Sequence, residues 1–310
     1  MESYSDFAYV YDTFMDNTPY EKWCDYIEKT LTEYNVPKEL VVDLGCGTGV
    51  LTRMLASRGY NMIGIDNSWE MLSIAREAEE SFICVDFDED IDFEEYNEDD
   101  SLEEAFEDGD IDVYVDGEDD FEGEYVDGDI IDDGEYSDDE SNQGILYLLQ
   151  DMREFELYGT VRAVVSVCDS VNYLLTDEDI IKCFKLVNNY LDPGGIFMFD
   201  FNTLHKYADV IGNTTIAENR EDCSFIWENV YDEESHINEY DLTIFSLDEE
   251  SGQFDKSIET HLQRGYTVEE MTYFVKAAGL LFVKAVDADT QSEVTLESER
   301  VYIIAKECMK

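Results

Sequence analysis

The sequence predicts an α/β fold in which a mostly parallel sheet lies between two layers of helices. Residues 40–66 read as a buried strand, a glycine-rich turn, a helix and a second strand. Beyond residue 143, strand and helix patterns alternate again, which is typical of parallel sheets. Residues 204–263 instead alternate apolar and polar side chains between acidic or glycine turns, which indicates an antiparallel meander.

The first strand runs into the sequence DLGCGTG, in which Asp43 precedes three glycines, Gly45, Gly47 and Gly49. Glycines at alternate positions allow a tight turn and let a ligand lie against bare backbone. The second strand ends at Asp66, where an acidic side chain can accept both hydroxyls of a ribose. The stretch therefore predicts a nucleoside site at the carboxyl edge of the sheet.

The other elements follow from caps, turns and periodicity. Two helices precede the sheet, and Pro19 can start the second. Thr176 and the pair Thr267 and Glu270 are typical helix caps. A D-P-G-G turn at 192–195 introduces a strand. The later core strands are expected at 145–149, 161–168, 196–201, 280–286 and 300–306, and the later helices at 176–190 and 267–278.

The ordered set of Asp43, three glycines, a helix and Asp66 resembles motif I of the class I S-adenosylmethionine (SAM)-dependent methyltransferases. The G-x-G-x-G spacing differs from the G-x-G-x-x-G of dinucleotide-binding folds. The resemblance covers the whole chain except the acidic residues 86–143 and part of the meander at 204–263. It implies a three-layer Rossmann-like fold with a seven-stranded sheet and SAM as the cofactor. Two alternatives to the methyltransferase assignment remain. The stretch could belong to a dinucleotide-binding oxidoreductase, or its glycines could serve only to form the turn.

The resemblance also implies cofactor roles. Asp43 would face the amino group of the methionine moiety, Asp66 the ribose, and Asp151 the adenine amino group. A helix cap or turn is the alternative for Asp151. The remaining cofactor candidates are Tyr20, Gly45, Cys46, Gly47, Gly49, Asn67, Met71, Met152 and Cys168.

Candidates for the acceptor side lie at the same edge. In related methyltransferases an amino-terminal Tyr-Asp pair and a later Tyr cover the cofactor, and Tyr11, Asp12 and Tyr20 match that pattern. Simple packing is the alternative for these aromatics. His205 could act as a general base near neutral pH, or be an exposed loop histidine. The candidates for catalysis are Tyr11 and His205, and those for acceptor binding are Tyr11, Asp169, Asn172 and Asn202.

Composition divides the chain into a core in three parts (1–85, 144–203 and 264–310) and two additions (86–143 and 204–263). From residue 86 to residue 140 there are 30 acidic and no basic residues, so 86–143 is predicted to be a disordered acidic insertion. The meander is expected to form a lid that turns one apolar face to the cleft. A decorative extension of the sheet is the alternative.

Charge and motifs also restrict the acceptor. The chain has 77 acidic and 19 basic residues, a formal net charge of −58, which repels nucleic-acid phosphates. No N-P-P tetrapeptide follows the fourth core strand. Both observations favour a small-molecule acceptor, methylated at N, O or C, and in particular a cationic amine. A non-catalytic SAM-binding scaffold and an RNA methyltransferase are the alternatives.

Other features concern the cellular setting. The chain shows no signal-peptide pattern and no apolar run long enough to span a membrane. Its seven cysteines lack C-x-x-C spacing and are expected to be free thiols in the cytoplasm. Three widely separated histidines argue against a histidine metal site.

Overall fold

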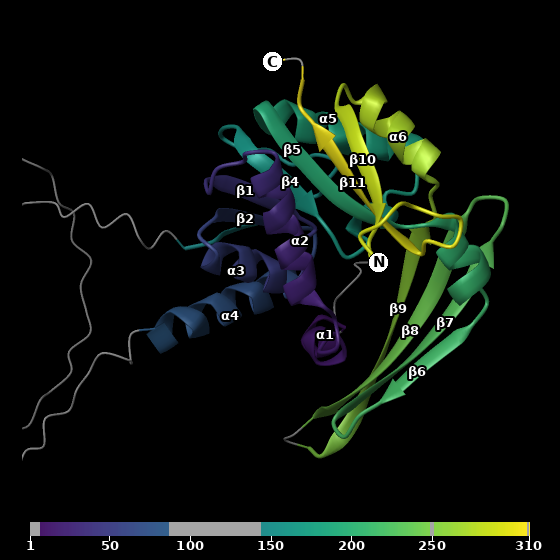
Figure 1. Cartoon of the computed structure of the whole chain (residues 1–310). Coiled ribbons are helices and arrows are strands. Elements are labelled where there is room, and N and C mark those ends of the chain that lie inside the picture. The colour runs from purple at the N-terminus through teal and green to yellow at the C-terminus, as the bar shows by residue number, and fades with distance from the viewer. Residues whose placement is uncertain (1–6, 87–143, 249–250, 309) are drawn as a thin grey trace, which may run out of the picture. The chain divides into compact units, whose positions relative to one another are not determined.

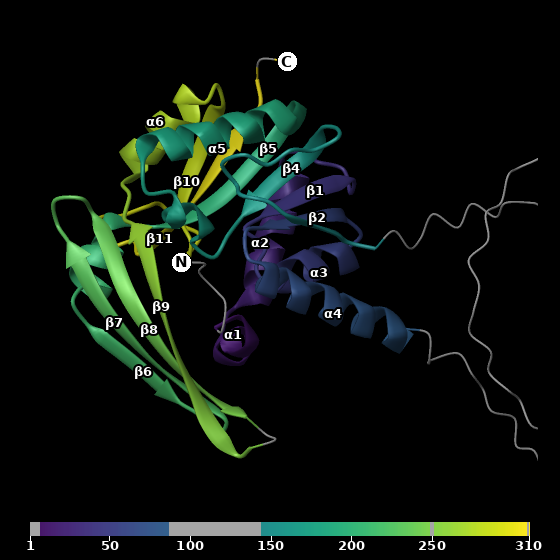
Figure 2. The same cartoon turned by 180° about the vertical axis from the view of Figure 1, so that it is seen from behind.

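The computed structural model describes residues 7–86, 144–248, 251–308 and 310. Its centre is a seven-stranded sheet with the strand order β10-β11-β5-β4-β1-β2-β3, seen from opposite sides in Figures 1 and 2. Strands β1 to β5 run parallel, and β11 pairs antiparallel with both of its neighbours. The predicted α/β fold with a mostly parallel, seven-stranded sheet is therefore confirmed.

The core elements have the following bounds. The strands are β1 (Leu40–Leu44), β2 (Asn61–Asp66), β3 (Leu146–Leu149), β4 (Val161–Ser166), β5 (Leu191–Asn202), β10 (Leu281–Asp287) and β11 (Arg300–Lys306). The helices are α1 (Ala8–Phe14), α2 (Tyr20–Glu33), α3 (Val50–Ser57), α4 (Trp69–Asp86), α5 (Asp177–Tyr190) and α6 (Val268–Ala277). Two short segments complete the core, the 3-10 helix η1 (Ser170–Tyr173) and the π-helix η2 (Lys206–Ile211).

Strand β1 shows how the three layers form. Successive side chains of a strand point to opposite faces. Val42 therefore packs on one face with Phe184 of α5, and Val41 packs on the other face with Ile27 of α2 and Leu55 of α3. Burial on both faces explains the nearly continuous apolar run of this strand.

The strand order places the site. From β1 the chain builds outward through β2 to β3, and then returns to add β4 and β5 on the other side of β1. The order in which successive strands are added to the sheet therefore reverses between β1 and β4. In open α/β sheets, ligands bind outside the carboxyl ends of the strands at such a reversal.

The predicted caps are confirmed, whereas one predicted turn is not. The Thr176 side chain accepts a hydrogen bond from the Asp179 N–H, and Thr267 and Glu270 form a capping box on α6. The segment 192–195 is part of β5, not a turn before it. The pairing of β4 with β5 jumps from Val161 with Leu191 to Ala163 with Ile196, so the D-P-G-G residues form a bulge.

A second sheet, which we call the lid sheet, follows η2. Its strands are β6 (Thr215–Asn219), β7 (Cys223–Asp232), β8 (Ile237–Asp248) and β9 (Gln253–Arg264), antiparallel and in that order. The predicted meander is confirmed, and β6 adds a strand that the sequence did not predict. In Figures 1 and 2, α1 lies between the core sheet and the lid sheet. Val10 of α1 packs there against Tyr240 and Leu242 of β8.

Two predictions concern other parts of the chain. The acidic insertion falls almost wholly on residues outside those that the structure describes, and its disorder stays a prediction. Among the helices of the described ranges, none combines the length and the apolar character that crossing a membrane requires.

Candidate active site

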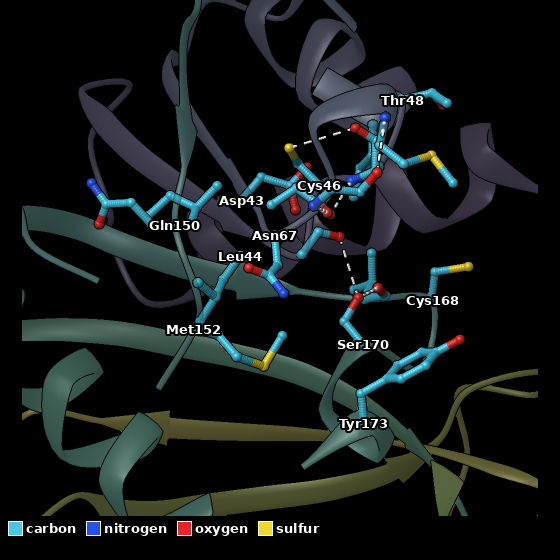
Figure 3. A pocket seen from close by; sticks show the side chains of 18 of the residues that line it. Asp43, Leu44, Cys46, Thr48, Asn67, Gln150, Met152, Cys168, Ser170 and Tyr173 are labelled. Atoms are coloured by element: carbon cyan, nitrogen blue, oxygen red, sulfur yellow. Dashed lines mark hydrogen bonds between the residues drawn. The ribbon is translucent and has the colours of Figure 1, made fainter. Parts of the chain in front are cut away.

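A cavity of about 370 Å³ lies where the strand order reverses, at the carboxyl ends of β1, β2 and β4. In Figure 3, Gln150 and Met152 stand on one side of it, and Cys168 and Tyr173 on the other. The predicted site residues that line it are Tyr11, Tyr20, Asp43, Gly45, Cys46, Gly47, Asp66, Asn67, Met71, Asp151, Met152 and Cys168. The predicted residues outside its lining are Gly49, Asp169, Asn172, Asn202 and His205.

Asp43 ends at the floor of the cavity and is only 2% exposed. The Thr52 hydroxyl donates to one of its carboxylate oxygens at 2.6 Å. Burial, and to a lesser degree the charge of Asp66, raise the pKa of Asp43 to about 7. A cation placed beside this carboxylate would stabilise its ionised form, so the site favours a positively charged ligand group.

Asp66 is held by the backbone around it. Its two carboxylate oxygens accept hydrogen bonds from the Gly47 N–H at 2.8 Å and the Ser68 N–H at 2.9 Å. Burial raises the pKa of Asp66, and these backbone donors oppose that shift. Since each carboxylate oxygen has two lone pairs, the fixed carboxylate can still accept hydroxyls from a ligand in the cavity.

The three glycines of the turn have different functions, although all three have a positive φ. A Cβ on Gly47 would meet no atom within 4 Å and would point into open space. A Cβ on Gly49 would lie 2.6 Å from the Tyr147 hydroxyl, and one on Gly45 would lie 2.5 Å from Ser170 Oγ. Gly49 therefore serves the packing of α3 on the sheet, which corrects its predicted place in the cofactor site.

Asp151 and Met152 line the cavity next to Asn67, as expected for an adenine pocket. Arg153 pairs with both carboxylate oxygens of Asp151, at 2.9 and 3.1 Å from its Nε. This pairing lowers the pKa of Asp151. The carboxylate therefore stays ionised and able to accept a hydrogen bond, while part of its capacity is already used by Arg153.

The opposite end of the cavity is aromatic and contains a thiol. The Tyr11 hydroxyl lies 3.6 Å from Cys168 Sγ, and Tyr20 stands beside them. Burial raises the pKa of Cys168 to about 12 and holds the pKa of Tyr20 well above its usual range. These groups are neutral at physiological pH, so they shape and cap the cavity without adding charge to it.

The backbone turns sharply after β4. Cys168 and Asp169 both have left-handed φ values, +64° and +54°, which are uncommon for residues other than glycine. Their N–H groups donate to the buried carboxylate of Asp200 on β5, at 3.1 and 2.8 Å. Arg300 of β11 lies between the acids, 2.9 Å from Asp169 and 3.6 Å from Asp200. This network holds Cys168 at the cavity wall.

Asn172 and Asn202 are structural. The Asn172 side chain donates to the backbone carbonyls of Asn202, at 3.0 Å, and Arg264, at 2.7 Å, and accepts from the Asn202 N–H at 2.8 Å. These bonds connect η1 to the ends of β5 and β9. The predicted acceptor-binding role of both residues is therefore corrected to a role in holding the cavity wall.

His205 is placed away from the cavity. It precedes η2, and its Nδ1 lies 2.8 Å from the exposed carboxylate of Asp209, one helical turn further on. Because the imidazole is not part of the cavity lining, the structure gives no support to its predicted role as a general base.

Several residues at the site were not predicted. Tyr173 lines the cavity, and His261 and Glu259 of β9 lie behind it. A sequence signal for the last two was present: Glu259, His261 and Gln263 are polar residues at alternate positions of one strand. They face inward, so at β9 the prediction of an apolar inner face is wrong.

Comparison with known proteins agrees with this geometry. Residues 41–116 match a family model described as "Methyltransferase domain". The Bacillus subtilis (strain 168) protein named "Putative methyltransferase YqeM" is 31% identical over 98% of this chain and 96% of its own. A solved S-adenosylmethionine-dependent methyltransferase from Clostridium acetobutylicum ATCC 824 has a TM-score of 0.72 and 23% identity, covering 99% of this chain and 100% of its own. The sugar N-methyltransferase KedS8 from Streptoalloteichus sp ATCC 53650 has a TM-score of 0.64 and 11% identity, covering 97% and 93%.

The cavity residues fit SAM. SAM carries a cationic amino group and a sulfonium, and the buried Asp43 carboxylate is most stable beside a cation. Its ribose offers two hydroxyls, for which Asp66 provides a fixed acceptor at the end of β2. The open space over Gly47 leaves room for a ligand against the backbone. The full-length relative, the shared fold and this fit lead to one conclusion: the chain belongs to the Rossmann-like, SAM-dependent methyltransferases and is an enzyme that uses SAM as its cofactor.

Proposed function

We propose that this enzyme transfers the methyl group of SAM to a small-molecule acceptor, and that the methylated atom is an amine nitrogen. The observation that carries the proposal is the end of the cavity at Cys168 and Tyr173, which the lid sheet and α1 cover and behind which the carboxylates of Asp169 and Asp200 lie. The lid sheet and α1 pack against each other over this end, through Val10 with Tyr240 and through the Phe7 N–H, which donates to Glu259 at 2.9 Å. Such an enclosure suits a small acceptor.

Charge supports an acceptor that arrives as a cation. Two carboxylates, those of Asp169 and Asp200, lie directly behind the cavity wall at Cys168, and the single guanidinium of Arg300 offsets only part of their charge. An excess of negative charge attracts ammonium groups and repels phosphates. The structural neighbour KedS8 is a sugar N-methyltransferase, which is consistent with an amine acceptor.

The demands of the reaction match these residues. SAM supplies a methyl group on a cationic sulfur: the acceptor lone pair forms the new bond to the methyl carbon, and the carbon–sulfur electron pair stays on sulfur. The protein has to align the acceptor, exclude water and accept a proton. Tyr11, Tyr20 and Cys168 would wall the acceptor in, and a nearby group would take its proton.

The test is release of S-adenosylhomocysteine (SAH) from SAM with a panel of probes: primary amines, amino sugars, phenols, carboxylic acids and a short RNA. We expect turnover with members of the amine classes, and loss of that turnover in Asp66→Ala. Turnover confined to phenols or acids would overturn the nitrogen assignment. Turnover confined to RNA would overturn the small-molecule assignment as well.

A further inference from the structure

The inner face of β9 has the opposite pattern from an ordinary half-exposed strand. Glu259, His261 and Gln263 face inward and are 5%, 1% and 3% exposed, whereas Ile258 and Leu262 face outward and are 55% and 39% exposed. Antiparallel sheets normally turn their apolar residues to the core. Burying a carboxyl and an imidazole costs free energy unless they are paired. Their burial on this strand therefore indicates that the two groups have a role beyond packing.

Two of these buried side chains, those of His261 and Glu259, are connected to the cavity through Tyr173. His261 Nδ1 lies 3.1 Å from the hydroxyl of Tyr173, which lines the cavity. His261 Nε2 lies 3.3 Å from a carboxylate oxygen of Glu259. Tyr240 stacks on the imidazole with ring centroids 4.8 Å apart, and its hydroxyl lies 3.0 Å from that of Tyr173. A continuous polar chain therefore runs from the cavity to Glu259.

Hydrogen bonds connect this polar chain to the elements around it. Asn172 precedes Tyr173 and is hydrogen-bonded to the Arg264 carbonyl at the end of β9. Gln263 of the same strand donates to Asp169 at 2.7 Å, and the second oxygen of Glu259 accepts from the Phe7 N–H. The lid sheet, η1 and the amino-terminal segment are thus tied together at the positions that present Tyr173 to the cavity.

We propose that Tyr173 is the catalytic residue that removes the proton of the acceptor, with His261 and Glu259 as positioning residues that make this possible. The proposal rests on the proposed function, since it assumes an acceptor that loses a proton on methylation. Tyr173 is assigned the role because it lines the cavity and its hydroxyl is hydrogen-bonded to the imidazole of His261.

The proton balance is as follows. An acceptor that arrives as an ammonium ion has no free lone pair, so one of its protons first moves to Tyr173 Oη, and the freed lone pair then attacks the methyl carbon of SAM. The Tyr173 proton moves at the same time to Nδ1 of His261, and the imidazolium is stabilised by the carboxylate of Glu259. When the product leaves, the proton returns by way of Tyr173 to water in the open cavity. No oxidant or further reactant is required.

The surroundings of His261 suit this role. The titratable groups that face it, directly or through Tyr240, are Tyr173, Tyr240, Glu259, Cys168 and Asp169. Burial holds the pKa of Tyr240 far above its usual range, so that hydroxyl stays a neutral donor.

The kinetic test uses the probe amine that reacts fastest in the panel, with SAM. General acid–base groups contribute roughly 10² to 10⁴ in rate. We therefore expect Tyr173→Phe and His261→Gln to lower kcat by about a hundredfold and Glu259→Gln by about tenfold. The Kd for SAH should change less than about threefold, because these residues lie at the acceptor end. His205→Gln is the matched control, and it should keep the wild-type kcat.

Two readouts separate this role from a structural one. The wild-type rate should reach a plateau at high pH, whereas the rate of Tyr173→Phe should keep rising, because solvent base replaces the lost group. Imidazole added to His261→Gly should restore part of kcat. An unchanged kcat with an unchanged pH profile in Tyr173→Phe and His261→Gln would overturn the proposal.

A spectroscopic arm needs no acceptor. In the SAH complex at pH 9, ¹⁵N chemical shifts should show His261 with Nδ1 unprotonated and Nε2 protonated, and His205→Gln and His236→Gln provide the assignment. A proton on Nδ1 would overturn the relay. If the panel identifies a phenol in place of an amine, the amine assignment fails, and the same variants are measured on that phenol.

Discussion

At the scale of single residues, Asp43 illustrates how position decides chemistry. It belongs to a strand buried on both faces, and its side chain lies at the floor of the cavity. Burial brings its pKa to about 7, so it is partly protonated at neutral pH without a ligand. A protonated carboxyl cannot form an ion pair with the amino group of SAM or SAH.

The pH dependence of SAH binding follows. As pH rises through 7, Asp43 loses its proton and the site gains the charge that the ligand requires, so affinity should increase. We expect binding about tenfold weaker at pH 6 than at pH 8, because the ionised fraction falls about tenfold per pH unit below the pKa. Calorimetric titration across this range measures it.

Two variants serve as controls for this dependence of SAH affinity on pH. Asp43→Asn should bind SAH weakly and with little dependence on pH. Asp151→Asn should keep the slope, because its arginine partner lowers the pKa of Asp151 far from this range. A slope of wild-type size in Asp43→Asn would contradict the assignment.

The glycines of the turn give a second prediction. Gly49→Ala should lower the free energy of unfolding by more than about 2 kcal/mol, because φ is +74° and the new methyl collides with Tyr147. Gly47→Ala meets no atom and should lose only about 1 kcal/mol from its positive φ. It should nevertheless weaken SAH binding at least about tenfold, because its methyl enters ligand space. Urea unfolding and calorimetry measure the two effects, and equal losses of stability would contradict them.

At the scale of elements, β11 does more than close the sheet. Its first residue, Arg300, joins the loop after β4 to β5 by pairing with Asp169 and Asp200. Burial raises the pKa of Asp200 to about 6 although Arg300 opposes the shift. The left-handed backbone at Cys168 thus depends on a charge supplied from the far end of the chain.

Removing that charge should be costly. Arg300→Met leaves two carboxylates without their cation, and we expect a loss of about 3 kcal/mol in the free energy of unfolding. Asp200→Asn in the same background should recover part of it. Arg162→Met removes ion pairs with Glu39 and Asp192 at the surface and should leave the denaturation midpoint almost unchanged. Equal effects of the two arginine variants would contradict the role given to Arg300.

At the scale of the whole molecule, the two halves of the site differ in how far the sequence predicts them. Much of the cofactor half is encoded in one continuous stretch, 40–66, where Asp43, Gly47 and Asp66 are placed by a strand, a turn and a strand. Local periodicity and turn chemistry suffice there. The exception is Gly49, whose neighbour Tyr147 is nearly a hundred residues away in the chain.

The acceptor half is assembled from distant segments. Tyr173, His261 and Arg300 come from η1, β9 and β11, and β9 belongs to the lid sheet whereas β11 belongs to the core sheet. No short sequence motif indicates that residues so far apart in the chain contribute to one site. This is why His205, a histidine near a predicted edge, was selected from the sequence, while His261, buried in the lid sheet, was not.

Calorimetric titration with SAH tests most directly the claim that the cavity at the ends of β1, β2 and β4 holds the cofactor. We predict micromolar binding by the wild type and by Asp241→Ala, an exposed carboxylate on the lid sheet. Asp66→Ala should bind at least about tenfold more weakly, because it loses the acceptor of the ribose hydroxyls. A folded wild type that gives no binding heat, or an Asp66→Ala variant that binds as tightly, would contradict this account of the site.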